Sequence, residues 1–200
     1  MTAARWGNLI DAVRAVHQAD TRLTDFSPFP DDLKSQDVSP FHIPSSDLLQ
    51  SETGLFTEPA YQAVRDALVD CASLACWRET YKDTSIGEDF MARFGCYGLI
   101  GPNAPVTSSK MLAWVVYMPA RLWYPYHHHP GEEMYLTLAG SADFLKHGAE
   151  RETLRPGDVA VHASNQPHAT ETHEHPMLAY AVWRNGFDTA PALTPQDAMQ

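Results

Sequence analysis

The sequence of 200 residues has few cysteines, little positive charge and no long apolar run. Its three cysteines are odd in number and lack a CxxC spacing, which argues against a disulfide framework and a zinc knuckle. Lys and Arg number 14 against 25 Asp and Glu, and the formal net charge of -11 disfavours nucleic acid and anionic membranes as partners. No stretch approaches the roughly 18 apolar residues that span a bilayer, and no signal-peptide core is visible. We therefore expect a cytoplasmic protein.

Helical patterning is confined to the early part of the chain. Apolar residues recur at spacings of three and four over residues 6–19 and 59–81, which predicts two amphipathic helices. Residues 26–56 between them are rich in Pro, Ser and Asp, and we expect an irregular wrap with at most a short helix or strand. A chain of this length can fill one core, so a single domain with an appendage is expected.

Strand signals dominate the rest of the chain. About eight short strands with turns between them match a double-sheet jelly roll. They are expected at 112–118, 122–126, 134–138, 142–146, 150–154, 158–162, 169–172 and 178–183. The sequence thus predicts a mainly β fold in three parts. An N-terminal helical and irregular segment (1–100) packs on a barrel (101–186), and a C-terminal tail follows (187–200).

The segment HHHPGEEMYLTLAG has the spacing of a metal site. His127, His129 and Glu133 stand in the order His-x-His-x3-Glu, and Gly140 follows after six more residues. Because side chains alternate along a strand, His127 and His129 share one face and His128 points the other way. Two imidazoles and a carboxylate suit one first-row divalent ion, with zinc, iron and manganese all left open.

A further ligand is expected from the stretch GDVAVHASNQPHATET, where His168 is the best candidate. His162, in the strand-like run before it, is left open between a core histidine and a site residue. Two short histidine motifs separated by several strands are the pattern of a cupin, a small jelly-roll barrel with the metal inside. The leading glycine of the first cupin motif is replaced by Arg121 here, and the second motif is looser.

Aromatic residues cluster around these motifs. Tyr135 follows Glu133 by two positions and so shares its face, and Tyr124 shortly precedes the histidine run. Trp123, Tyr180 and Trp183 lie on strands that could also face the barrel. Most such side chains simply fill a barrel, but a tyrosine beside a carboxylate ligand is a candidate for chemistry.

Three stretches resemble the cupin-type dimethylsulfoniopropionate (DMSP) lyases of marine bacteria. They are YPYHHHPGEEMYLTLAG (124–140), VHASNQPHATET (161–172) and AVWRNG (181–186). Weaker similarity extends through CWRETY (76–81) and FGCYGLIGP (94–102). The resemblance covers most of the chain beyond residue 70, and it implies a metal-dependent lyase. Such an enzyme eliminates dimethyl sulfide from DMSP, a small zwitterionic sulfonium, and leaves acrylate.

The resemblance also implies roles for individual residues. The metal ligands correspond to His129, Glu133 and His168, with His127 either a further ligand or a substrate contact. The substrate carboxylate is expected on the metal, and the pocket is expected to include Tyr124 and Trp183.

The chemistry requires a base and a place for the sulfonium. A phenol, with a pKa of about 10, needs a metal or a cation nearby before it can accept a proton at neutral pH. Tyr135 is the first choice as base and Tyr124 the second. The faces of Trp183 and Tyr124 can hold the sulfonium by cation–π attraction.

Two other functions stay open from the sequence alone. One is another metal-cupin enzyme, such as a dioxygenase acting on a small substrate. The other is a non-catalytic cupin that binds a cationic osmolyte. The oligomeric state is expected to be a monomer or a homodimer.

Overall fold

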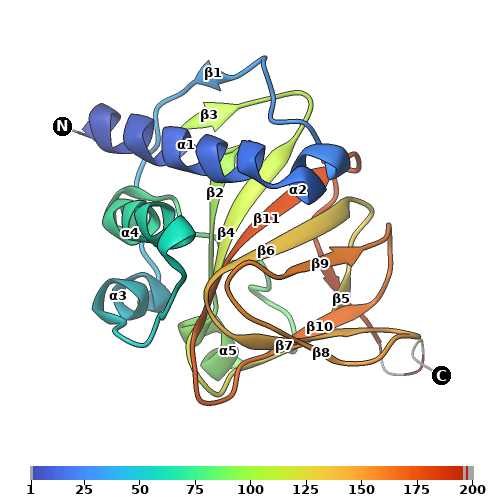
Figure 1. The fold of residues 1–200 in the computed structure, drawn as a ribbon. Helices are drawn as coiled ribbons and strands as arrows, with labels where there is room; N and C mark the ends of the chain where they lie inside the picture. Colours follow the sequence, from blue (N-terminus) through green and yellow to red (C-terminus); the bar gives the residue numbers. More distant parts are fainter. Residues whose placement is uncertain (1, 196, 198–200) are drawn as a thin grey trace.

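The computed structural model describes residues 2–195 and residue 197, and its strands form two sheets around a common interior (Figure 1). The larger sheet has the strand order β1-β3-β2-β4-β11-β6-β9, and the smaller has the order β12-β5-β10-β7-β8. Neighbouring strands are antiparallel except β2 and β3, which are parallel. The bounds are β1 Lys34–Ser35, β2 Gly95–Ile100, β3 Val106–Thr107, β4 Leu112–Met118, β5 Trp123–His128, β6 Glu132–Gly140, β7 Ala142–Lys146, β8 Glu152–Leu154, β9 Val159–His162, β10 His168–Glu171, β11 Met177–Arg184 and β12 Ala192–Leu193.

Helices α1 to α4 cover the outer face of the larger sheet, whereas α5 lies at the end of the barrel and adds Phe90 to the interior core (Figure 1). Apolar residues of α1 and α4 share one buried core with residues of β2, β6 and β11. This covering explains why these strands are buried on both faces. The helical bounds are α1 Thr2–Ala19, α2 Thr21–Phe26, α3 Pro44–Ser51, α4 Gln62–Cys71 and α5 Glu88–Arg93, with 3-10 turns at Pro59–Tyr61 and Ala72–Leu74. None of the described helices has the length and hydropathy needed to span a bilayer.

Strand β11 lies inside the larger sheet, between β4 and β6, and contributes side chains to two cores. Tyr180 and Val182 point to the helices, whereas Ala181 and Trp183 point into the space between the sheets. This period of two is the ordinary alternation of a strand. It places the inner residues of β11 beside those of β6, so that Trp183 pairs with Glu133.

The fold confirms the mainly β, cupin-type double-sheet barrel with an N-terminal helical segment. The eight strands expected from the sequence correspond to β4 through β11. The sheets also take in β2, upstream of residue 101, and β12, which pairs with β5 from within the expected tail. The last part of that tail, residues 196 and 198–200, lies outside the described residues.

The helix predicted over 59–81 is wrong in its last part, because helical structure ends at Leu74. The chain turns extended at Ala75, and Trp77 joins a β-bridge to Tyr97. The Trp77 ring packs 4.9 Å from the Tyr97 ring, and its indole N–H donates to the carbonyl oxygen of Ala72 at 2.8 Å. Burial of this tryptophan therefore overrides the helical pattern.

The irregular segment over 26–56 holds somewhat more regular structure than expected, namely β1 and the eight-residue helix α3.

Candidate metal centre

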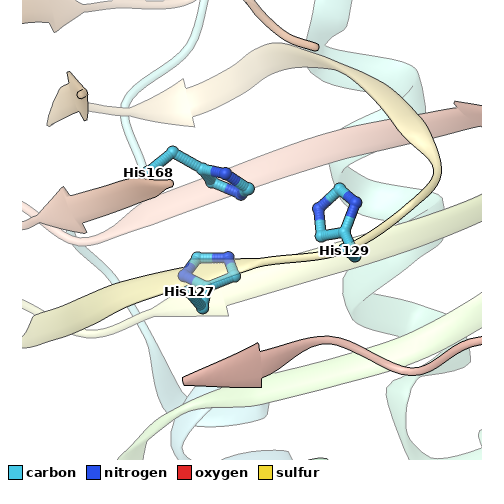
Figure 2. A group of neighbouring side chains, drawn as sticks. All are labelled: His127, His129 and His168. Atoms are coloured by element: carbon cyan, nitrogen blue, oxygen red, sulfur yellow. The ribbon is translucent and has the colours of Figure 1, made fainter. Parts of the chain in front are cut away.

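Four histidines and one glutamate meet between the two sheets. The smaller sheet supplies His127 and His168, which are paired across β5 and β10, and His129 follows β5 directly. The three imidazoles converge in Figure 2, with ring centres 4.1 Å apart for His127 and His168 and 5.0 Å apart for His129 and His168. The larger sheet supplies Glu133 and His162, paired across β6 and β9. The register of strand pairing in the two sheets therefore brings these five residues together.

One carboxylate oxygen lies at the centre of the cluster. Glu133 Oε2 is 3.2 Å from His129 Nε2, 3.3 Å from His162 Nδ1 and 3.4 Å from His168 Nε2. All five side chains are buried, none more than 3% exposed. Two overlapping triads could each hold a metal ion, since their ligand atoms lie within 4.8 Å of one another. They are His127, His129 and His168, and Glu133, His162 and His168.

Backbone carbonyls fix the orientation of three of the rings. The Nδ1 atoms of His127, His129 and His168 lie 2.8–2.9 Å from the carbonyl oxygens of Pro125, Gly131 and Gln166. Because a carbonyl only accepts, Nδ1 carries a proton, and in the neutral ring Nε2 then presents a lone pair, as in metal-binding histidines.

Two buried imidazole nitrogens of the cluster lack a hydrogen-bond partner within the described part of the chain. They are His162 Nε2 and His168 Nε2. An unpaired buried nitrogen is costly, and a bound cation would satisfy it. The donor set and these orphaned atoms therefore fit a divalent metal ion.

The ionisation of the cluster suits a cation as well. Burial alone would raise the pKa of the Glu133 carboxyl, but the charge of His129 and hydrogen bonds from His129 and His162 hold it well below its usual range. Burial lowers the pKa of His127 well below its usual range and that of His162 to about 3. At neutral pH the site therefore offers an ionised carboxylate and the neutral imidazoles of His127 and His162, whereas the charge of Glu133 outweighs burial and raises the pKa of His129.

Aromatic rings form the walls of the site. Trp183 stacks on His129 at 4.1 Å, and its indole N–H donates to Glu133 Oε1 at 2.6 Å. Tyr124 stacks on His127 at 3.9 Å, and its hydroxyl is 2.7 Å from that of Tyr81. The rings of Trp183 and Tyr124 therefore contact the candidate metal ligands directly and also line the cavity.

Tyr135 lies in the interior beside this cluster and lines the same cavity as Glu133. Burial, reinforced by the negative charge of Glu133, raises the pKa of its phenol well above the usual range. The cavity itself has a volume of about 30 Å³, enough for little more than a water molecule. A larger ligand would need side chains around the cavity to move.

Comparison with known proteins decides the family. A sequence model of dimethylsulfoniopropionate lyase matches residues 17–179. The chain is 46% identical over 187 residues to dimethylsulfoniopropionate lyase DddQ of Ruegeria pomeroyi, covering 94% of this chain and 92% of the relative. The chain belongs to the dimethylsulfoniopropionate lyase family.

Solved structures agree with this assignment. The crystal structure of the DMSP lyase DddQ from Ruegeria pomeroyi superimposes with a TM-score of 0.93 at 44% identity, over 96% of each chain. A chain from the crystal structures of the DMSP lyases RdDddP and RnDddQII also gives a TM-score of 0.93, at 32% identity, over 98% of this chain and all of the other. The family fold therefore extends through both the helices and the barrel.

The structure brings the seven predicted site residues of this family member into one place. They are His127, His129, Glu133, His168, Tyr124, Tyr135 and Trp183. His128 points away and approaches Thr194 Oγ1 at 2.9 Å. Two other aromatic residues that could have faced the barrel do not: Trp123 is 40% exposed, and Tyr180 lies in the core beneath the helices.

Sequence reasoning left some neighbours of the site unassigned. His162 reaches the cluster because β9 pairs with β6, and its place opposite Glu133 depends on that pairing. Tyr81 and Arg78 come from the segment between the helical region and β2, and nothing in their local spacing marks them. The only signal was the weak family resemblance of CWRETY.

Proposed function

We propose that the protein is a metal-dependent lyase that cleaves DMSP into dimethyl sulfide and acrylate. The observation that carries this proposal is the buried His/Glu cluster sharing one small cavity with Tyr124, Tyr135 and Trp183, in a chain of the DMSP lyase family. The relative from Ruegeria pomeroyi, 46% identical, is named for this activity.

His129, Glu133 and His168 would hold the metal, with His127 as a further ligand or a contact to substrate. His162 donates to the shared carboxylate oxygen and fixes it from the opposite side. A bound divalent ion would supply positive charge that stabilises a substrate carboxylate and favours the ionised form of a nearby phenol. Imidazole and carboxylate ligands accept zinc, iron or manganese.

Tyr135 is the proposed base and Tyr124 the second choice. The Tyr135 phenolate takes the proton from the carbon next to the substrate carboxylate. The electrons of that C–H bond form the double bond of acrylate, and the C–S pair leaves with sulfur as neutral dimethyl sulfide. The hydroxyl of Tyr124 is already engaged with Tyr81, which favours Tyr135.

The sulfonium is proposed to lie against Trp183 and Tyr124. Cation–π attraction amounts to about 0.5–2 kcal/mol per contact. One face of each ring is occupied by a histidine, and Phe94 also packs 4.6 Å from the Tyr124 ring. Trp183 is therefore the stronger candidate of the two.

The decisive experiment measures headspace dimethyl sulfide and dissolved acrylate from purified protein given DMSP. It compares untreated protein, protein treated with a chelator, and chelated protein to which each divalent metal is added back in turn. We expect equimolar release that the chelator abolishes and one or more divalent metals restore. Failure to release either product with any metal would refute the lyase. The cytoplasmic location and the monomeric or dimeric state are not addressed by this assay and stay predictions.

Substitution of Tyr135 by Phe tests the base. We expect kcat to fall by roughly 10²- to 10⁴-fold, the usual contribution of a positioned base, with the metal content unchanged. Tyr124→Phe should cost less, and Tyr126→Phe is the matched control, because Tyr126 packs against Trp123 away from the cavity. Retention of most activity in Tyr135→Phe would reassign the base.

A further inference from the structure

An outer pocket adjoins the metal cavity. Its volume is about 500 Å³, against about 30 Å³ for the inner cavity. The residues that line both are Arg78, Thr80, Trp114, Trp183 and Pro191. These side chains form the partition between the two spaces, and a ligand entering from the outer pocket has to pass them.

Arg78 is the only charged side chain of this partition. Its guanidinium lies over the Trp114 ring, 4.3 Å from the centroid. Within the described residues no carboxylate forms an ion pair with it, whereas most other arginines of the chain have such a partner. A half-buried cation without a counter-ion is a ready site for an anion.

Trp114 adds a second unsatisfied donor at the same place. Its indole Nε1 is buried and has no acceptor among the described residues. A buried N–H without a partner is unusual in a folded protein, and a ligand oxygen would satisfy it. An unpaired cation and an unpaired N–H in one partition are both satisfied by a carboxylate.

The charged residues that line only the outer pocket are negative, opposite in sign to Arg78. Glu79 and Asp188 line the outer pocket but not the inner cavity. Glu79 pairs with Lys82 at 3.0 Å, while Asp188 is exposed and forms no ion pair within the described chain. A zwitterion in the outer pocket therefore finds positive charge at the inner end and negative charge farther out.

We propose that Arg78 and Trp114 form a carboxylate-recognition site in the partition between the outer pocket and the metal cavity. This site admits a zwitterionic substrate with its carboxylate end first. The site lies outside the metal cluster and selects for ligands that carry a carboxylate. The proposal rests on the proposed lyase function, because carboxylate-first entry is what delivers that group toward the histidines. Arg78 acts here as a positioning residue.

The test uses two fragments of the substrate as probes on the metal-loaded protein. Propionate carries the carboxylate alone, and trimethylsulfonium carries the cation alone. We expect Arg78→Met to weaken propionate binding at least about tenfold in calorimetry, and Arg78→Lys to restore most of it. Trimethylsulfonium should bind Arg78→Met as well as the wild type or better. Lys110→Met is the control, since Lys110 lines neither space, pairs with Asp31 away from both, and should leave both affinities unchanged.

Equal propionate affinity in the wild type and Arg78→Met would overturn the proposal, as would absent propionate binding in the wild type. A parallel loss of both probes would show a structural effect instead and overturn it too. In turnover, Arg78→Met should raise KM for DMSP about tenfold and change kcat by less than about threefold. Because propionate binding needs no turnover, a protein that binds propionate through Arg78 but releases no dimethyl sulfide would refute the lyase while leaving this site standing.

Discussion

Trp183 links the aromatic wall to the candidate metal ligands. Its N–H donates to Glu133 Oε1 while its ring stacks on His129. A partner that orients a metal ligand typically contributes 10- to 100-fold in metal affinity. Trp183→Phe keeps a stacking ring and removes the donor. We therefore expect the metal affinity to fall by about 10-fold or more, measured by competition with a chromogenic chelator.

The matched control for this substitution is Trp123→Phe. Trp123 is also on a strand, but it is 40% exposed and contacts Tyr126 outside the site. Its replacement should leave metal affinity unchanged. If Trp183→Phe binds metal as tightly as this control does, the hydrogen bond to Glu133 does not position that carboxylate for the ion.

At the scale of elements, the end of β6 depends on Gly140. Its φ of +70° lies in the left-handed region, and a Cβ at this position would collide with the carbonyl of Pro176. Gly140→Ala should lower the free energy of unfolding by on the order of 3 kcal/mol or more, because backbone strain and the collision act together. Urea denaturation measures this loss.

Gly148 provides the comparison. It has a φ of +80°, but an added Cβ meets no atom within 4 Å. Gly148→Ala should therefore cost only the conformational strain, about 1–2 kcal/mol. Equal losses in the two variants would mean that the contact with Pro176 relaxes at little cost.

Helix α1 is joined to the larger sheet by a buried histidine. His17 Nε2 lies 2.8 Å from the carbonyl oxygen of Ser27, to which it donates, and Nδ1 accepts from the Tyr180 hydroxyl at 3.0 Å. Burial lowers the pKa of His17 below the usual value of about 6.5 for a histidine. The unfolded chain therefore binds the proton more readily than the folded protein does. Stability is full above about pH 6.5 and is lost as the pH falls toward the folded pKa.

His17→Gln should weaken this pH dependence. The free energy of unfolding at pH 7.5 should fall by about 1–2 kcal/mol, because two buried hydrogen bonds are disturbed. The further drop between pH 7.5 and 5.5 should be smaller than in the wild type. The exposed His42→Gln serves as control and should retain the full drop. A drop as steep in His17→Gln as in the wild type would assign the dependence to other groups.

The elements also show which parts of the structure could be predicted from sequence. β4 and β7 have the bounds expected, and the ligand order on β5 and β6 followed from local spacing, because alternation along one strand needs no tertiary information. The placement of His162 opposite Glu133, and of Trp183 beside it, depends on the pairing of β6 with β9 and β11. That register is fixed by the whole fold. The helix expected to continue to residue 81 ended early for the same reason, since the burial of Trp77 is a tertiary effect.

At the scale of the whole molecule, the proposed metal would connect the two sheets. His127 and His168 belong to the smaller sheet, whereas Glu133 and His162 belong to the larger. The unfolded chain does not hold these groups together, so an ion bound to the folded protein stabilises it by mass action. At a free metal concentration of about 1,000 times Kd this amounts to about 4 kcal/mol. For a chain of this size we expect Tm to rise by about 8–16 °C on adding metal and to fall again with a chelator.

Two histidine variants distinguish stabilisation by a metal bound between the sheets from stabilisation by ions bound at the acidic surface. His129→Ala should lose most of the metal-dependent rise in Tm, because it removes a nitrogen beside Glu133. His128→Ala should keep the rise, since His128 contacts Thr194 outside the cluster. The net charge of -11 predicts some nonspecific cation binding in both, but that contribution declines with added salt. A rise in Tm that persists in His129→Ala at high salt would place the stabilising ion elsewhere, and the two sheets would then be held together by their apolar interior without a bridging metal.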